Sequence, residues 1–238
     1  MQTPQVPQAL KSVVGVTLTA GVHQYTGGET AIPYTVSGYA GKSVILWLCG
    51  TDGTSWKLPS SAPLEAALIV PHFANLLKTT KGKAWKARPP GWLQVFAAAV
   101  QCECEARGLL FTVMGFSRGA FWASHFALHV KMDRLVLVGW YPEPGEEDHR
   151  IVSNGAALEP QVLMVQSPID QLCSFSKAKL FEQGLRQKPH NQFVEVSVTH
   201  ERLFNIMQID DRCAENYNHL GHYILMFATQ VAPEKVEA

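Results

Sequence analysis

The sequence predicts an α/β fold in which helices cover both faces of a mostly parallel central sheet. Several apolar runs have the length of a strand, and two of them, 43–49 and 135–139, contain almost no polar residue. Such runs are typical of strands that are buried on both faces of a sheet. Segments of helical periodicity lie between the runs, and this alternation favours parallel pairing of the strands. The chain has 238 residues, which is enough for a sizeable core.

The chain is expected to begin with a tail and a β-hairpin. Residues 1–12 have neither the basic start nor the apolar run of a signal peptide, so we expect a flexible tail. Two apolar segments, 13–18 and 31–36, flank a glycine-containing turn at 25–29, which is the pattern of a hairpin. No repeat or linker divides the remainder, and we expect a single domain over 13–238.

The later elements alternate along the chain. The expected strands are short and rich in apolar residues, and they span 43–49, 66–71, 109–114, 135–139, 162–165 and 192–199. The expected helices carry apolar residues three and four positions apart, and they span 92–106, 120–128, 176–186 and 213–231. The basic segment 74–92 also contains Gly and Pro residues, and its interpretation as a solvated loop is favoured over an anion site.

Composition narrows the functional classes. The 20 Lys and Arg residues balance 20 Asp and Glu residues, so no net charge attracts nucleic acid or an anionic membrane. No apolar stretch approaches the roughly 20 residues that a membrane span requires. The five cysteines are odd in number and irregularly spaced, which favours reduced thiols in a cytoplasmic protein. The sequence contains no motif for a cofactor or a metal, and we expect neither.

The segment Gly115-Phe116-Ser117-Arg118-Gly119 carries most of the functional signal. It lies between an expected strand and an expected helix, and a serine between two glycines at such a junction is typical of the nucleophile elbow of a serine hydrolase. The sharp turn strains the backbone at the serine, and glycine at both outer positions avoids a collision. The alternative is a loop that joins a strand to a helix without any chemistry.

A nucleophilic serine needs a base, and the base needs an acid that orients it. Elbow-containing hydrolases have these groups in the order Ser, acid, His. Asp170 follows an expected buried strand and is the candidate acid, with a turn or helix-cap role as the alternative. His200 directly follows the last expected strand and is the preferred base. His222 and His219 remain alternative bases, although their place in the last expected helix favours solvated side chains.

An oxyanion hole requires two backbone N–H groups near the nucleophile. The residue after the serine, Arg118, is the first candidate donor. The second is Thr51, which follows the expected strand 43–49 and stands beside Gly50, where the backbone can approach a substrate closely. An ordinary glycine turn is the alternative interpretation of this segment.

Four segments match the motifs of one known family in order. Residues 48–56 resemble L-H-G-x-G-D-T-G-x-x-W, 70–73 resemble P-H-A, 115–119 resemble G-F-S-Q-G-G, and 167–170 stand where the family has G-D-x-D. The chain thus resembles the phospholipase/carboxylesterase family, which includes the acyl-protein thioesterases. Cys49 departs from the family pattern, which has histidine at that position.

The resemblance implies a single-domain α/β-hydrolase fold without a large lid. It further implies cleavage of carboxylic esters or thioesters, with Ser117 as nucleophile, Asp170 as acid and His200 as base. Thr51 and Arg118 then supply the oxyanion donors.

The resulting hypothesis is a serine hydrolase that cleaves a small-molecule acyl ester or thioester through an acyl-enzyme intermediate. Two alternatives stay open. One is a non-catalytic module of the same fold that binds a ligand or a protein, because a fold by itself does not confer a function. The other is an acyltransferase that passes the acyl group to an acceptor other than water.

Overall fold

The structure is a computed structural model. It describes residues 15–50, 56–59, 62–63, 65–72, 89–141, 158–208 and 218–229. The tail expected over 1–12 lies outside these residues, as do positions 74–88 of the expected basic loop.

The described residues form one eight-stranded sheet, in the order β1-β2-β4-β3-β5-β6-β7-β8. The strands are β1 Gly21–Tyr25, β2 Ile32–Gly38, β3 Ser43–Leu48, β4 Ala66–Pro71, β5 Leu110–Phe116, β6 Arg134–Val138, β7 Gln161–Gln166 and β8 Gln192–Glu195. Strand β2 pairs antiparallel with both β1 and β4, whereas every pair from β4 to β8 is parallel. The prediction of a mostly parallel sheet is confirmed.

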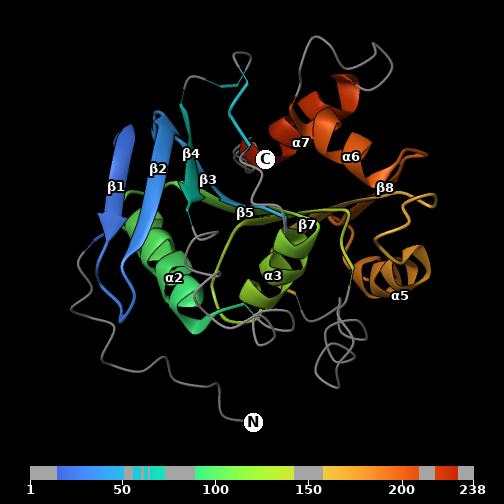
Figure 1. The fold of residues 1–238 in the computed structure, drawn as a ribbon, viewed down its shortest axis with the longest axis horizontal. Coiled ribbons are helices and arrows are strands. Elements are labelled where there is room, and N and C mark those ends of the chain that lie inside the picture. Colours follow the sequence, from blue (N-terminus) through green and yellow to red (C-terminus); the bar gives the residue numbers. More distant parts are fainter. Residues whose placement is uncertain are drawn as a thin grey trace, which may run out of the picture.

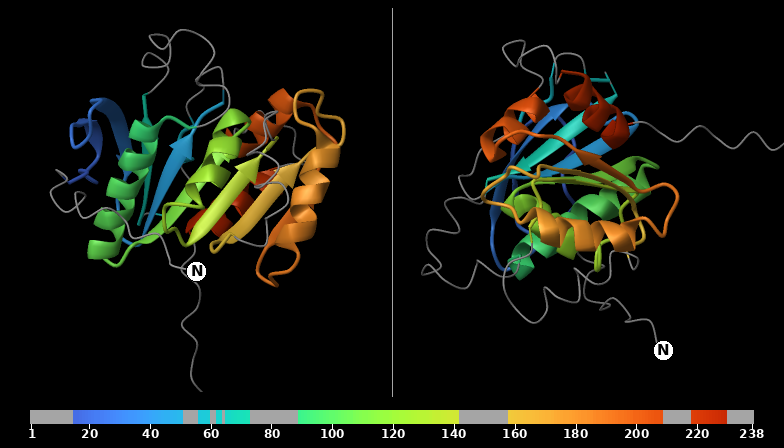
Figure 2. Two further views of the ribbon diagram at one scale, coloured as in Figure 1. Left: turned by 90° about the horizontal axis from the view of Figure 1, so that it is seen from below. Right: turned by 90° about the vertical axis from the view of Figure 1, so that its right-hand side faces the viewer.

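Helices cover both faces of this sheet, as the sequence predicts. They are α2 Gly91–Ala106, α3 Arg118–Phe126, α5 Phe175–Leu185, α6 His200–Gln208 and α7 Asn218–Thr229. Helices α2, α3 and α5 lie on one face, and α6 and α7 lie on the other (Figures 1 and 2). Because both faces are covered, all six residues of β3 and all five of β6 are buried. None of the helices within the described ranges combines the length and apolar character that crossing a membrane requires.

Helix α7 is held to the sheet by hydrogen bonds to its last carbonyl groups. The hydroxyl of Thr112 on β5 donates to the carbonyl of Ala228 at 2.7 Å. The guanidinium of Arg134 on β6 donates to the carbonyl of Phe227 and lies 5.4 Å from the centroid of that residue's ring. These two buried side chains therefore tie the last described turn of α7 to β5 and β6.

The hairpin exists, but its first strand is not where the sequence predicts it. Strand β1 begins at Gly21, and the described part of the expected strand 13–18 is not in the sheet. Val16 and Leu18 are buried in the core, and the Thr17 N–H donates to the Tyr34 hydroxyl at 2.9 Å. The apolar pattern of this segment therefore results from the packing of irregular backbone against the core. It does not result from backbone pairing with a neighbouring strand.

The expectations for the last third of the chain also need correction. The strand expected over 192–199 ends at Glu195, because Val198 instead bonds to the side chain of Ser167. Helix α6, which begins at His200, is not among the helices that the sequence predicts. Helix α7 corresponds to the middle of the helix expected over 213–231, whose two ends lie outside the described residues.

Candidate active site

Ser117 joins β5 to α3 in a strained backbone conformation. Its φ is 54° and its ψ is −120°, and no other non-glycine residue in the described ranges has a positive φ. Its N–H donates to the Val138 carbonyl on β6 at 2.9 Å, and its carbonyl accepts from the N–H groups of Ala120 and Phe121 at 3.0 and 3.2 Å. Sheet and helix thus hold the residue from both sides, which is how an unfavourable conformation persists at a functional position.

The two glycines around Ser117 are required for different reasons. A Cβ on Gly115 would lie 2.5 Å from the backbone nitrogen of Ala120, so the strand could not pass the first turn of α3. A Cβ on Gly119 would lie 2.6 Å from the carbonyl oxygen of Cys49, just beyond β3. Gly115 therefore permits the sharp turn, whereas Gly119 permits α3 to approach the neighbouring strand.

The proposed oxyanion donors are described only in part. Arg118 is the first residue of α3, so its backbone lies at the N-terminus of a helix, where N–H groups favour negative charge. Its guanidinium is buried and donates to the Tyr141 hydroxyl at 3.1 Å. Thr51, the second predicted donor, lies outside the described residues, and the oxyanion hole stays a prediction.

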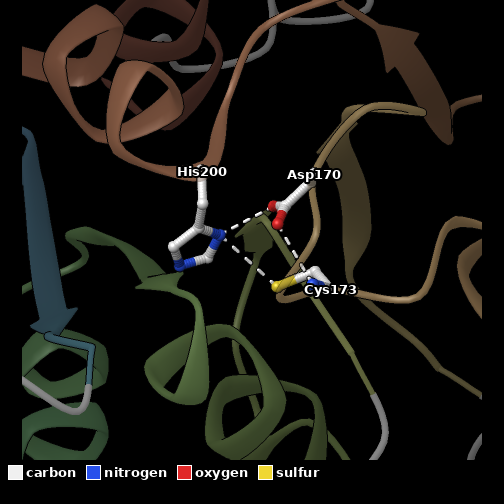
Figure 3. Close-up of side chains that lie close together, drawn as sticks. All are labelled: Asp170, Cys173 and His200. Carbon is white, nitrogen blue, oxygen red and sulfur yellow. Dashed lines mark hydrogen bonds and ion pairs between the residues drawn. The ribbon is translucent and has the colours of Figure 1, made fainter.

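Asp170 and His200 are hydrogen-bonded to each other. Nδ1 of His200 lies 2.7 Å from Oδ2 of Asp170 (Figure 3). The other carboxylate oxygen accepts from the backbone N–H groups of Leu172 and Cys173 at 2.8 and 3.1 Å. A carboxylate that accepts several hydrogen bonds and neighbours an imidazole orients that ring, as the acid of a catalytic triad does. The structure thus brings together the two residues that the sequence singles out as acid and base.

The environment of Asp170 keeps its carboxylate ionised. Burial alone would raise the pKa of this side chain, which is completely inaccessible to solvent. The hydrogen bond from His200, the charge of that ring and the two backbone N–H groups outweigh burial, and the pKa lies below the ordinary value of 3.8. The carboxylate is therefore negative at neutral pH and supports a positive charge on His200.

The loops that carry the acid and the base are linked by Ser167, which sequence reasoning missed. Its Oγ donates to the carbonyl of Val198 at 2.5 Å and accepts from the N–H of the same residue at 3.2 Å. Ser167 lies in the loop before Asp170, and Val198 precedes His200. This hydroxyl, together with the hydrogen bond from the Val196 N–H to the Gln166 carbonyl at 3.0 Å, holds the two loops side by side.

The ring of His200 packs against the carboxyl ends of β5 and β6. Its centroid lies 4.7 Å from that of Phe116, the residue before Ser117. At the end of β6, a Cβ on Gly139 would lie 3.2 Å from Cε1 of the same ring. Nε2 points away from Asp170 in Figure 3. The imidazole thus lies at the carboxyl ends of the central strands, where Ser117 also lies, and one of its nitrogens is bonded to Asp170.

Helix α6 is anchored so that His200 keeps this position. The Phe204 ring, on the next turn of α6, lies 5.2 Å from the Phe116 ring. Further along, the carbonyl of Met207 accepts from the indole N–H of Trp56 at 2.7 Å. A histidine at the start of a helix that is held at two later points has little freedom to turn away.

The alternative bases lie elsewhere. His219 and His222 are exposed on α7, as expected for solvated positions on that helix. The hydrogen bond to Asp170 is made by His200.

The same cluster contains a cysteine. Potential ligand atoms of Asp170, Cys173 and His200 lie within 4.8 Å of one another. Burial, followed by the negative charge of Asp170, raises the pKa of the Cys173 thiol far above its usual value, and Sγ donates to the Gly139 carbonyl at 2.9 Å. A metal would require the thiolate and would have to replace hydrogen bonds that are already satisfied, so the donor set does not fit a metal.

Searches against protein-family models and against curated protein sequences gave no match. Solved structures do share the fold. A protein described as a dienelactone hydrolase from Klebsiella pneumoniae has a TM-score of 0.61 at 12% identity, with 88% of this chain and 97% of that chain covered. An esterase from Pyrococcus furiosus has a TM-score of 0.60 at 11% identity, with 96% and 98% covered.

A larger protein is similar over part of its length. The acylaminoacyl peptidase of Pyrococcus horikoshii has a TM-score of 0.65 at 8% identity, with 92% of this chain but 43% of that chain covered. The chain therefore spans less than half of that peptidase. These similarities show the α/β-hydrolase fold, as the sequence predicts, whereas the narrower resemblance to the phospholipase/carboxylesterase family stays a prediction.

The approach of α3 to β3 can be tested by Gly119→Ala. The added methyl group would meet backbone at Cys49 and not a movable side chain, so we expect a loss of about 3 kcal/mol or more in the free energy of unfolding. Gly91→Ala is the matched control, because no atom lies within 4 Å of its added Cβ and the residue opens α2. Urea unfolding is expected to show the control unchanged or stabilised by up to about 1 kcal/mol. Equal stability of both variants would contradict this description of the turn.

The lowered pKa of Asp170 predicts a pH-dependent contribution to stability. That contribution is complete above the pKa of the unfolded state and is lost as the pH falls through the lower pKa of the folded state. The difference in unfolding free energy between wild type and Asp170→Asn is therefore expected to shrink as the pH falls from about 5 to below about 4. Urea unfolding at a series of pH values measures it, and a difference independent of pH would rule out the contribution.

Proposed function

We propose that the chain is a serine hydrolase that cleaves a carboxylic ester or thioester. The observation that carries the proposal is the Asp170–His200 hydrogen bond of 2.7 Å. It lies at the carboxyl ends of the parallel strands, where Ser117 joins β5 to α3 in a strained conformation. Acid, base and candidate nucleophile follow the chain order Ser, acid, His, and each stands after a parallel strand. The shared fold of known hydrolases supports the reaction class.

In the proposed reaction, the Ser117 hydroxyl attacks the acyl carbonyl carbon. Nε2 of His200 accepts the hydroxyl proton while Nδ1–H remains bonded to Asp170. The ionised carboxylate of Asp170 stabilises the imidazolium that forms. The positive end of α3, beginning at Arg118, faces the charge that develops on the carbonyl oxygen, and Thr51 is the proposed second donor.

The tetrahedral intermediate collapses when the bond to the leaving group breaks. His200 gives its proton to the departing oxygen or sulfur, which leaves the acyl group on Ser117 as an ester. Water then attacks this ester while His200 takes a proton from the water. When the bond between the acyl carbon and the Ser117 oxygen breaks, His200 gives that proton to the Ser117 oxygen, and the carboxylic acid is released. Each stage returns the proton to its starting place, so the cycle consumes only the substrate and one water molecule.

A fluorophosphonate tests whether Ser117 is an activated nucleophile. We expect one adduct on wild type by intact-mass measurement and none on Ser117→Ala, because the phosphonyl group reacts with a serine that has a neighbouring base. Ser176→Ala, which changes an exposed serine on α5, is the matched control and is expected to label as wild type does. A folded wild-type protein that takes up no adduct would contradict the proposal and favour a non-catalytic binding module.

The choice of base can be tested with two histidine variants. We expect His200→Ala to lower kcat for a short acyl ester by about 1,000-fold or more, because removal of one member of a triad disables the unit. His222→Ala, on the exposed side of α7, is expected to keep kcat within about twofold, as is usual for a surface change. The reverse order of effects would assign the base to His222.

Product analysis with an added alcohol distinguishes hydrolysis from acyl transfer.

A further inference from the structure

Cys173 occupies the point at which the acid loop, the base and the end of β6 meet. Only 1% of its surface is exposed. Its backbone N–H donates to Oδ1 of Asp170 at 3.1 Å, and its Sγ lies 3.5 Å from Nδ1 of His200 (Figure 3). The same Sγ lies 2.9 Å from the Gly139 carbonyl. One residue therefore contacts both members of the acid–base pair and the neighbouring strand.

The hydrogen-bonding capacity of these groups decides which way each proton points. The Gly139 carbonyl accepts from the thiol at 2.9 Å, and the Asp170 carboxylate is a second acceptor beside the same thiol, so the sulfur keeps its proton. The proton on Nδ1 of His200 is donated to Asp170, whose oxygen is much closer than the sulfur. The sulfur therefore presents a lone pair to the imidazole N–H, where it is a weak acceptor and a poor competitor for the carboxylate.

We propose that Cys173 is a positioning residue. It holds the Asp170 carboxylate and the His200 imidazole in the orientation in which they are hydrogen-bonded, and it keeps water away from that bond. The inference rests on the proposed function for its kinetic consequence. Its structural content, a thiol that shields one hydrogen bond, is independent of catalysis.

Shielding of the Asp170–His200 bond from water matters because a charge-assisted hydrogen bond is stronger in a medium of low dielectric constant. Sulfur fills the space beside Nδ1 without adding charge, since burial and the charge of Asp170 raise the pKa of the thiol and keep it protonated. Water in that space would solvate the Asp170 carboxylate and weaken its support of the imidazolium. Loss of the sulfur should therefore weaken the support that Asp170 gives to the imidazolium form of His200.

The experiment compares Cys173→Ala with Cys173→Ser and with Cys104→Ala. Cys104 is the matched control, because it is also 1% exposed but lies on α2, outside the candidate site. For Cys173→Ala we expect kcat for a short acyl ester to fall about tenfold, with little change in KM. Misplacement of a catalytic group by about an ångström can cost 100-fold in rate, and the shift expected here is smaller. The acid limb of the kcat/KM profile is expected to move to lower pH.

The other two variants show what the thiol contributes. Cys173→Ser keeps a donor for the Gly139 carbonyl and is expected to recover most of the activity and the wild-type acid limb. It also provides the measurement if the alanine variant does not fold. Cys104→Ala is expected to keep the wild-type pH profile, even if it is less stable. A serine variant as impaired as the alanine variant would contradict a role for the thiol proton.

Proton NMR supplies a readout that does not depend on turnover. The Nδ1–H of His200 is expected to give a downfield resonance, assigned by its loss in His200→Ala. In Cys173→Ala this resonance should move upfield or broaden by exchange with water, and in Cys104→Ala it should not change. An unchanged resonance together with an unchanged acid limb in Cys173→Ala would overturn the inference. If wild type takes up no fluorophosphonate, the proposed function fails, and the resonance alone then decides whether Cys173 positions the pair.

Discussion

The backbone of Ser117 is the constraint on which the rest of the candidate site depends. A non-glycine residue at a φ of 54° costs of order 1–3 kcal/mol, and that cost persists only where surrounding structure enforces it. Here the enforcement comes from the strand pairing of β5 with β6 and from α3, every residue of which is buried. Gly115 and Gly119 matter because they allow these two elements to approach closely enough to hold the serine.

A second constraint is the burial of an ionised carboxylate. Asp170 can remain charged inside the protein because its oxygens receive hydrogen bonds from His200 and from two backbone N–H groups. The two N–H groups belong to the Asp170 loop itself, but the bond from His200 exists only if the loops after β7 and β8 keep their separation, which the hydroxyl of Ser167 helps to fix. The geometry of acid and base is therefore a property of two linked loops, with Cys173 closing the space between them.

Much of the architecture could be predicted because its causes are local. The apolar runs at β3, β4 and β6 identify strands buried on both faces, and the spacing of Leu93, Phe96 and Val100 identifies α2. The prediction failed at residues 13–18, where the apolar pattern is that of a strand. Val16 and Leu18 pack into the core while the Thr17 N–H bonds to a tyrosine hydroxyl instead of a neighbouring strand. Periodicity reports which side chains are buried but not which backbone groups pair.

The candidate site divides in the same way between sequence and tertiary structure. The amino-acid sequence alone determined the turn at Ser117 and the order of Ser, acid and His, because a tight turn needs glycine at particular positions and strands end where apolar runs stop. It left three histidines as possible bases. Only the tertiary structure decided that His200 bonds to Asp170 while His219 and His222 face solvent, and that Cys173 lies beside the pair. The reason is physical: a hydrogen bond between distant residues depends on where α6 packs against β5, and no local pattern encodes that position.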